Sequence, residues 1–234
     1  MGNQNKFVTA IILAAGSGRR MNSSCAKQNI EILGKSVLSW CVEAFSECKL
    51  ISSIVVVARE EDVENLKRCL PVKYPKISAI VSGGRCRAES AKNGYSAIPN
   101  ASEFVAIHDA ARCLITAENI GEIVTCAIEY GAATAASKLT DTVKLVSPDG
   151  FIESTVPRDK LYIAGTPQSF SVEKYQRALS EFKGDLANIT DDNMLLESIG
   201  EKVFTIDIGK ENIKITEQKD LEYAEFLLKK RANL

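Results

Sequence analysis

Short apolar segments alternate along the chain with segments whose apolar residues recur at helical spacing. Such alternation is typical of a parallel sheet flanked by helices. Residues 53–57 are nearly all Ile and Val, which predicts a strand buried on both faces. The pattern predicts strands at residues 7–13, 53–57, 77–81, 104–107, 161–165 and 203–208, and helices at 37–45, 60–69, 88–97, 117–130, 172–179, 191–199 and 218–230. We therefore expect an α/β fold with a Rossmann-like, mostly parallel sheet.

The alternation is interrupted after Ser137. Residues 142–146 and 151–156 flank the turn signal Ser147-Pro148-Asp149-Gly150 and predict a two-stranded hairpin. An isolated hairpin is only marginally stable in water, so this one is expected to pack on something beyond its own domain, most simply a second copy of the chain. With no repeat or long linker, residues 1–234 are expected to form one domain with an inserted dimerisation arm at about 139–160.

Composition and charge narrow the class of protein. The 234 residues are 45% hydrophobic and 25% charged, as in soluble globular proteins, and the formal charge of −1 argues against a general nucleic-acid or membrane-surface binder. No stretch approaches the roughly 18 apolar residues of a membrane span. The seven cysteines are an odd number without a C-x-x-C pair, which argues against a disulfide framework and a zinc site and favours a reducing cytoplasm.

The strongest local signal directly follows the first predicted strand. It is the run Leu13-Ala14-Ala15-Gly16-Ser17-Gly18-Arg19-Arg20-Met21, with Lys27 six residues further on. Small residues let backbone N–H groups approach an anion, and nearby cations neutralise a polyphosphate, so the run predicts a nucleoside triphosphate site. It is neither a Walker A motif nor a dinucleotide fingerprint, because no Gly-Lys-Ser/Thr follows and Met21 replaces the third Gly. If this run is considered alone, it could instead form a tight turn between a strand and a helix, with its arginines in solvent.

Further motifs follow this loop in a characteristic order. They are Gly83-Gly84-Arg85-Cys86-Arg87-Ala88-Glu89-Ser90, His108-Asp109-Ala110-Ala111-Arg112, Thr155-Val156-Pro157-Arg158, Thr166-Pro167-Gln168, Thr190-Asp191-Asp192 and Asn212-Ile213-Lys214-Ile215-Thr216. With the first loop and its Lys27-Gln28 pair, they resemble the 2-C-methyl-D-erythritol 4-phosphate cytidylyltransferases, nucleotidyltransferases with a glycosyltransferase-like α/β fold. The resemblance runs from about Ala10 to the last predicted helix. Seven dispersed motifs in order are far more specific than one glycine-rich loop.

The resemblance implies transfer of CMP from CTP to methylerythritol phosphate in the non-mevalonate isoprenoid pathway. Pyrophosphate would be released, and Mg²⁺ would be bound mainly through the CTP phosphates. The nucleophile would be a phosphate oxygen that is already anionic, so the site needs cations and no general base. His108, the single histidine, is therefore expected to be structural.

The resemblance also assigns roles to individual residues. It implies catalytic roles for Arg20, Lys27, Arg158 and Lys214. It implies nucleotide binding by Ala14, Ala15, Gly16, Gly18, Gly83, Gly84, Arg87 and Ser90, and binding of the polyol phosphate by Asp109, Arg112, Thr142 and Thr166. Asp109 is also a candidate metal ligand. Because the arm crosses to the other subunit in this family, Arg158 and Thr142 would complete the partner's site in a homodimer.

Each motif taken singly has a plain structural reading. Lys214 reads as an edge-strand charge, the Gly83-Gly84 pair as a simple turn, and Asp191 with Asp192 as caps of the following helix. Only the motifs together favour the enzymatic reading.

Three other functions fit parts of the sequence pattern. A ribitol-5-phosphate cytidylyltransferase is the nearest alternative, but its members tend to carry a different first loop and a different run around the arm arginine. A non-catalytic nucleotide-binding regulator is a second alternative, against which all four catalytic candidates are present. A nicotinamide dehydrogenase lacks the expected acidic residue about 20 positions after the loop.

The chain departs from the family pattern at three positions. Ala26 and Cys113 stand where prolines are usual, which is expected to loosen two loops without removing a reacting group. Arg85 stands where an acidic residue is common and adds positive charge near the expected base or ribose site.

Overall fold

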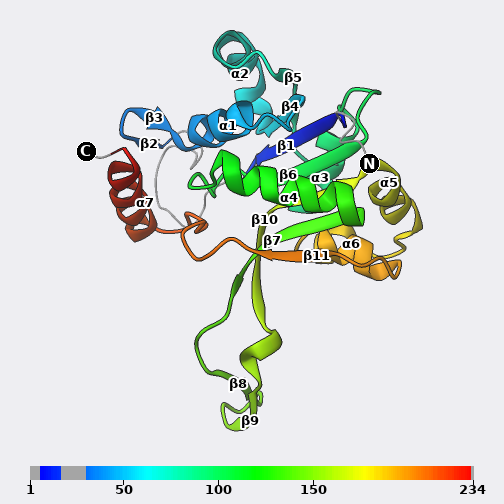
Figure 1. Cartoon of the computed structure of the whole chain (residues 1–234), viewed down its shortest axis with the longest axis vertical. Helices are drawn as coiled ribbons and strands as arrows, with labels where there is room; N and C mark the ends of the chain where they lie inside the picture. Colours follow the sequence, from blue (N-terminus) through cyan, green and yellow to red (C-terminus); the bar gives the residue numbers. More distant parts are fainter. Residues whose placement is uncertain (1–5, 17–29, 233–234) are drawn as a thin grey trace.

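One seven-stranded sheet forms the centre of the protein (Figure 1). The computed structural model describes residues 6–16 and 30–232. The strand order is β11-β7-β10-β6-β1-β4-β5. The strands are β1 (Val8–Ala14), β4 (Ser53–Ala58), β5 (Ile77–Ser82), β6 (Phe104–Asp109), β7 (Ala132–Lys138), β10 (Tyr162–Ser171) and β11 (Phe204–Asp207). All neighbouring pairs are parallel except those of β10, which is antiparallel to β6 and β7. The expected mostly parallel sheet is confirmed.

Helices cover both faces of the sheet, because successive side chains of each central strand point to opposite sides. Ala10 and Ile12 of β1 belong to one buried cluster, while Ile11 belongs to the other. The first cluster includes residues of α1 (Val37–Glu47), α2 (Glu60–Lys73), α4 (Ala117–Tyr130) and α7 (Gln218–Arg231). The second includes residues of α3 (Arg87–Tyr95), α5 (Val172–Glu181) and α6 (Asn193–Ser198). Every residue of β4 is buried, as its run of Ile and Val predicted.

Three of the larger elements differ most from the sequence pattern. Strand β7 was not predicted, because its Ala-rich sequence lacks the β-branched and aromatic residues that usually indicate a strand. Helix α2 continues past Pro71 to Lys73; the N–H of Tyr74 still donates to the carbonyl of Leu70 at 2.9 Å, so the proline removes only one bond near the helix end. Strand β10 extends well beyond the predicted residues 161–165.

The predicted hairpin is present as β8 (Val143–Val146) and β9 (Ile152–Val156), which pair antiparallel. Gly150 adopts a φ of 92°, and its N–H donates to the carbonyl of Ser147 at 2.9 Å, which closes the turn. The hairpin extends away from the sheet (Figure 1). Phe151 and Ile152 are 72% and 64% exposed. The arm therefore presents apolar side chains that this chain leaves uncovered.

Smaller elements complete the fold. A short β2 (Glu31–Ile32) pairs with β3 (Lys35–Ser36), and the 3-10 turns η3 (Arg158–Lys160) and η4 (Leu186–Asn188) lie at the base of the arm and before α6. Within the described ranges, no helix is long and apolar enough to span a membrane. The six cysteines that the structure describes are free thiols.

Candidate functional site

Two of the predicted nucleotide-binding segments, which follow β1 and β5, meet at the carboxyl ends of the parallel strands, across the end of β4. Such strand ends are where open α/β sheets bind ligands. The N–H of Gly83 donates to the carbonyl of Ala58, the last residue of β4, at 2.8 Å. A Cβ at Gly83 would lie 2.4 Å from the Cβ of Ala15 and 2.9 Å from the Oγ of Ser90. The structure thus brings Ala15, Gly83 and Ser90 together.

Parts of the first loop lie outside the described residues. Ala14 is buried at the end of β1, and Gly16 is exposed beside Ala15. Gly18, Arg20 and Lys27 fall in the segment that the structure does not describe, as does Ala26.

The hydroxyl of Ser90 shapes the glycine loop. It accepts a hydrogen bond from the N–H of Gly84 and donates one to the carbonyl of Cys86, each at 3.0 Å. A Cβ at Gly84 would lie 2.4 Å from the Cβ of Glu89, so the loop needs glycine there. Arg85 pairs with Glu89 through its Nε at 3.0 Å, so a carboxylate balances the added positive charge.

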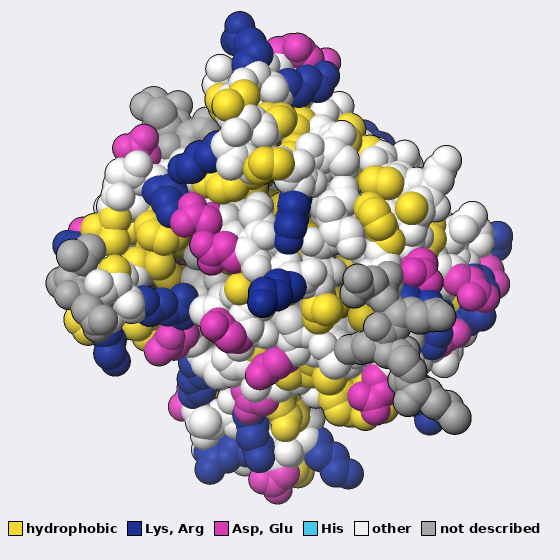
Figure 2. Space-filling model, turned by 45° about the horizontal axis from the view of Figure 1, so that its top comes forward, with side chains coloured by type: hydrophobic (Ala, Val, Ile, Leu, Met, Phe, Trp, Pro, Cys, Tyr) yellow, Lys and Arg dark blue, Asp and Glu magenta, His cyan; other side chains and the backbone are white. Residues whose placement is uncertain are grey.

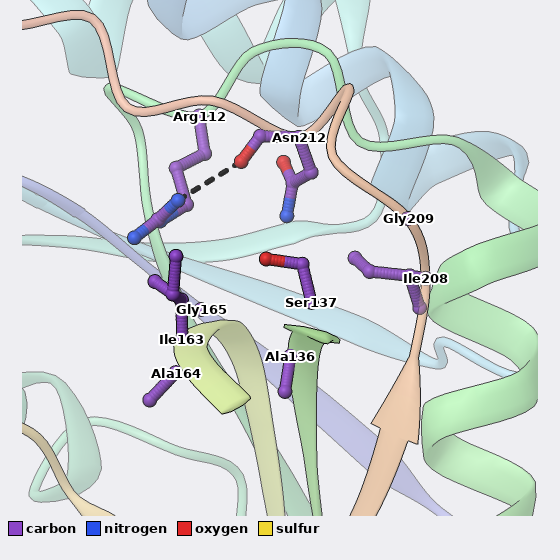
Figure 3. Close-up of a pocket in the computed structure, with 9 residues that line it drawn as sticks. All are labelled: Arg112, Ala136, Ser137, Ile163, Ala164, Gly165, Ile208, Gly209 and Asn212. Atoms are coloured by element: carbon purple, nitrogen blue, oxygen red, sulfur yellow. Dashed lines mark hydrogen bonds between the residues drawn. The ribbon is translucent and has the colours of Figure 1, made fainter. Parts of the chain in front are cut away.

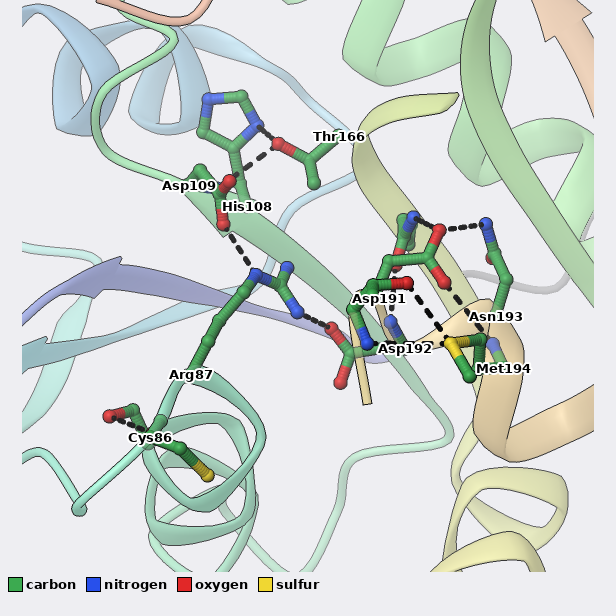
Figure 4. Close-up of polar contacts among 12 residues, drawn as sticks. Cys86, Arg87, His108, Asp109, Thr166, Asp191, Asp192, Asn193 and Met194 are labelled. Atoms are coloured by element: carbon green, nitrogen blue, oxygen red, sulfur yellow. Dashed lines mark hydrogen bonds and ion pairs between the residues drawn. The ribbon is translucent and has the colours of Figure 1, made fainter. Parts of the chain in front are cut away.

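Four charged side chains form an alternating row across the site. Arg87 reaches from α3 between two carboxylates, with its Nε donating to Asp109 at 2.9 Å and its Nη1 donating to Asp192 at 2.6 Å (Figure 4). The other oxygen of Asp109 accepts from the Nζ of Lys214 at 2.7 Å. The order Asp192, Arg87, Asp109, Lys214 therefore alternates in sign and joins four sequence-distant segments.

The position of Asp109 determines its charge. Burial alone would raise the pKa of its carboxyl, but Arg87 and Lys214 together hold that pKa well below its ordinary value. The same two carboxylates, Asp192 and Asp109, outweigh burial and raise the pKa of Arg87. Both groups are charged throughout the physiological pH range.

The prediction that the Asp192 side chain caps a helix is wrong. This side chain is fully buried and makes no capping hydrogen bond. Its carboxylate accepts from the hydroxyl of Tyr175 at 2.8 Å, and its N–H donates to the Oε1 of Gln168 at 2.8 Å. The capping role falls to Asp191, whose Oδ1 accepts from the N–H of Met194 at 3.2 Å (Figure 4). Asp192 instead faces Arg87, because a buried carboxylate needs an opposite charge.

His108 lies beneath Asp109 in the core. Burial lowers the pKa of its imidazole to about 4, so the ring is neutral at pH 7. Its Nδ1 lies 3.0 Å from the hydroxyl of Thr166 and its Nε2 lies 3.2 Å from the carbonyl of Arg112. The Thr166 hydroxyl also accepts from the N–H of Asp109 at 3.1 Å. His108 thus links two of the predicted acceptor-binding residues through their backbone and hydroxyl groups.

A small cavity of about 30 Å³ lies beside this row (Figure 3). Arg112 and Asn212 line it together with residues at the end of β7, near the start of β10 and just after β11. The Nη1 of Arg112 donates to the carbonyl of Asn212 at 2.9 Å, and the Nδ2 of Asn212 donates to the carbonyl of Thr166 at 2.8 Å. Among residues 6–16 and 30–232, the buried Nε of Arg112 and the buried Oδ1 of Asn212 have no hydrogen-bond partner. Such unpaired polar atoms are costly unless a ligand or water meets them.

The two predicted arm residues lie apart from this row. Arg158 and Thr142 are exposed, and the Nη1 of Arg158 donates to the carbonyl of Thr140 at the base of the arm. Within the described residues, no hydrogen bond or ion pair joins either of them to Asp109 or Lys214. One chain alone does not assemble all the predicted site residues that the structure describes.

The donor set fits a metal carried by a substrate. In the part of the chain that the structure describes, no three His, Cys, Asp or Glu side chains gather in a metal-binding arrangement. Asp109 is a single carboxylate at a strand end, beside loops predicted to bind phosphates. Mg²⁺ is commonly held by one or two carboxylates together with substrate phosphates, so Asp109 fits a Mg²⁺ of that kind.

Several residues of this polar cluster were missed or misassigned from the sequence. Asp192 and Gln168 belong to motifs quoted above, so their presence was visible but their partners were not. Tyr175 carried no signal at all, since a lone Tyr in an amphipathic helix reads as core. Asn212 lies two residues before Lys214 in the last motif, and the sequence pattern predicts no role for it.

The surface around the site carries both signs of charge. Figure 2 shows Lys and Arg side chains interspersed with Asp and Glu on the face it presents. This mixture agrees with the formal net charge of −1.

Comparison with known proteins assigns the family. Residues 8–230 match the model of the 2-C-methyl-D-erythritol 4-phosphate cytidylyltransferase family. The chain is 40% identical over 227 residues to the enzyme of that name from Clostridium acetobutylicum, covering 95% of this chain and 98% of the relative. It is also 40% identical over 220 residues to that of Endomicrobium trichonymphae, covering 94% and 98%. The crystal structure of 4-diphosphocytidyl-2C-methyl-D-erythritol synthase from Anaerococcus prevotii superposes with a TM-score of 0.81 at 34% identity, covering 96% and 97% of the two chains. The chain belongs to the 2-C-methyl-D-erythritol 4-phosphate cytidylyltransferase family.

Proposed function

We propose that this protein transfers CMP from CTP to 2-C-methyl-D-erythritol 4-phosphate. The products are 4-diphosphocytidyl-2-C-methyl-D-erythritol and pyrophosphate. The observation that carries the assignment in the structure is the 2.7 Å ion pair between Lys214 and Asp109, which holds a partly exposed cation at the carboxyl end of β6, next to the end of β1. Family membership over residues 8–230 supports the same reaction.

The reaction needs positioning and charge more than proton transfer. An oxygen of the acceptor phosphate forms a bond to the α-phosphorus of CTP, and the bond from that phosphorus to the bridging oxygen of pyrophosphate breaks. The attacking oxygen is already anionic at neutral pH, so no base has to remove a proton. Cations placed where negative charge develops are the expected source of the rate enhancement. The neutral, buried His108 fits a supporting role.

The residues divide between the two substrates. The segment from Ala14 to Gly16 and the loop of Gly83 and Gly84 border one end of the site, where we place the nucleotide. Lys214, with the Arg112 cavity beside it, borders the other end, where we place the acceptor phosphate and its polyol. Asp109 lies between these ends and would be the protein ligand of a Mg²⁺ that neutralises the CTP phosphates.

A homodimer would complete this site. The arm leaves Phe151, Ile152, Leu145 and Val146 at least half exposed, which is unusual for apolar side chains unless a partner covers them. Within the described residues, no hydrogen bond or ion pair joins Arg158, on the same arm, to Lys214. We therefore place Arg158 and Thr142 in the site of the partner subunit. The six free thiols fit a reducing, cytoplasmic location.

The first experiment measures pyrophosphate release with CTP and Mg²⁺. The acceptor is methylerythritol 4-phosphate, ribitol 5-phosphate or none. Release with methylerythritol 4-phosphate alone is expected. Release with ribitol 5-phosphate alone would instead assign the ribitol activity, and binding of CTP without release with either acceptor would favour a regulatory protein. Neither alternative matches the names of the relatives reported above.

A further inference from the structure

The guanidinium of Arg87 is held between two carboxylates that differ in their access to solvent. The side chain of Asp192 is 0% exposed, whereas that of Asp109 is 11% exposed at the site. Arg87 directs one N–H to each of them, at 2.6 Å and 2.9 Å. Asp192 therefore cannot touch a substrate, yet it provides half of the charge that fixes Arg87.

Asp192 is itself fixed from the core. The hydroxyl of Tyr175 donates to its Oδ1 at 2.8 Å, and the Tyr175 ring stacks on Phe170 at 5.6 Å and meets Tyr95 edge-on at 5.2 Å. Tyr175 is fully buried, so no solvent competes for this hydrogen bond. The row of charges thus begins at an anchor in the second hydrophobic cluster.

The other end of the row is the part that meets solvent. The Oδ1 of Asp109 accepts from Arg87, and its Oδ2 accepts from Lys214, whose side chain is 42% exposed. A guanidinium readily takes both oxygens of one carboxylate in a two-bond pair. If Arg87 lost Asp192, it would be free to turn both bonds onto Asp109 and displace Lys214.

We infer that Asp192, held by Tyr175, is a positioning residue that acts through Arg87 and Asp109 to hold Lys214 in place for the acceptor phosphate. The inference rests on the proposed role of Lys214. Neither Asp192 nor Tyr175 contacts a substrate in this account. Their effect reaches the reaction only through the two ion pairs of Asp109.

The test compares Asp192→Asn and Tyr175→Phe with Tyr95→Phe. Tyr95 is the matched control, because its ring packs on Tyr175 while its hydroxyl points to the carbonyl of Val172 at 3.5 Å and not to Asp192. Asp192→Asn is expected to raise the KM for the acceptor and lower kcat, reducing kcat/KM by about 10- to 100-fold, as small displacements of reacting groups do. Tyr175→Phe is expected to reduce kcat/KM for the acceptor about 3-fold, since one hydrogen bond that supports Asp192 is lost. The KM for CTP is expected to stay within about twofold, and Tyr95→Phe to leave all three constants unchanged.

A coupling measurement separates positioning from general stability. In a Lys214→Ala background, Asp192→Asn is expected to cost less than about threefold, because the residue through which it acts is gone. If Asp192→Asn is folded and retains its kcat and acceptor KM, or if its cost is the same with and without Lys214, the inference is wrong. If Asp192→Asn does not fold, Tyr175→Phe decides: unchanged acceptor kinetics would overturn the inference. A protein that is inactive before any substitution would refute the proposed function instead.

Discussion

Glycine at position 83 is the residue on which the nucleotide end of the site depends most directly. Gly83→Ala would set a Cβ 2.4 Å from that of Ala15, so one of the two segments must move. We expect the KM for CTP to rise about 10-fold or more, because backbone groups that border the nucleotide site are displaced. Initial rates of pyrophosphate release at varied CTP provide the measurement. Gly121→Ala, whose added carbon meets nothing within 4 Å, is the control, and equal CTP kinetics in the two variants would contradict the prediction.

The single histidine gives a clean pH measurement. The pKa of His108 is lowered to about 4 by burial, from about 6.5 in an unfolded chain. Between these pH values the unfolded state binds more protons, so the free energy of unfolding falls as the pH falls from about 6.5 to 4, by up to about 3 kcal/mol from this group.

His108→Gln should lack this part of the pH dependence, which denaturant melts of both proteins at pH 7 and pH 4 can measure. The unaltered chain has one imidazole, so its NMR signal can be followed directly. A midpoint near 6.5 in the folded protein would show that the ring is not held neutral.

At the residue scale, some of the predicted site residues lie close together in the structure, but the sequence did not predict how they pair. Gly83, Ser90, Arg87 and Asp109 were all selected, and the structure places them around one edge of the sheet. The contacts of Arg87 with Asp109 and Asp192 could not be predicted, because they join residues 22 and 105 positions apart. Such pairings depend on strand order, which no local pattern contains.

Helix α4 shows how a single element is bounded. Thr116 caps its start by accepting from the N–H of Asn119 at 3.2 Å, and Gly131 ends it with a φ of 85°. The sequence predicted both limits of this helix. Gly131→Ala should destabilise the protein by about 1 kcal/mol, since side chains avoid this backbone conformation.

Gly121→Ala, within the same helix, should stabilise the protein by about 0.5–1 kcal/mol through reduced chain entropy. The midpoints of urea unfolding measure both changes. Shifts of the same sign in the two variants would be inconsistent with this account.

The local pattern missed β7, because the stability of this strand comes from tertiary structure. Strand β7 is stabilised by pairing with β10 and β11 on both sides, not by its own residues, which are mostly Ala. Tertiary pairing can override a weak β propensity. In contrast, β4 can be predicted from its sequence, because a strand covered on both faces is apolar at nearly every position.

At the scale of the whole molecule, the decisive prediction concerns exchange of the arm. Lys214→Ala and Arg158→Ala are each expected to lose activity by at least about 100-fold as homodimers. In a mixed dimer, one of the two sites would combine the intact Lys214 of one chain with the intact Arg158 of the other. Purified heterodimers, carrying two different tags, should therefore recover up to about half of the unaltered activity.

No recovery in verified heterodimers would place each site within one chain. The sequence predicted the assembly on two grounds: a hairpin interrupts a regular α/β pattern, and the family resemblance implies an arm that crosses to the other subunit. The sequence pattern could not predict that the apolar side chains of the arm are exposed in the single chain, because their exposure depends on the direction in which the arm leaves the sheet.

Strand β10 joins the base of the arm to the centre of the site without a break. Its Tyr162 pairs with Lys138 beside the arm, Thr166 meets Asp109, and Gln168 meets Asp192. A chimera that takes its arm from another family member, together with β10, would therefore also take the residues of β10 that contact Asp109 and Asp192. The exchanged segment should therefore begin before Ala132 and end after Ser171, so that β7, the hairpin and β10 are transferred together.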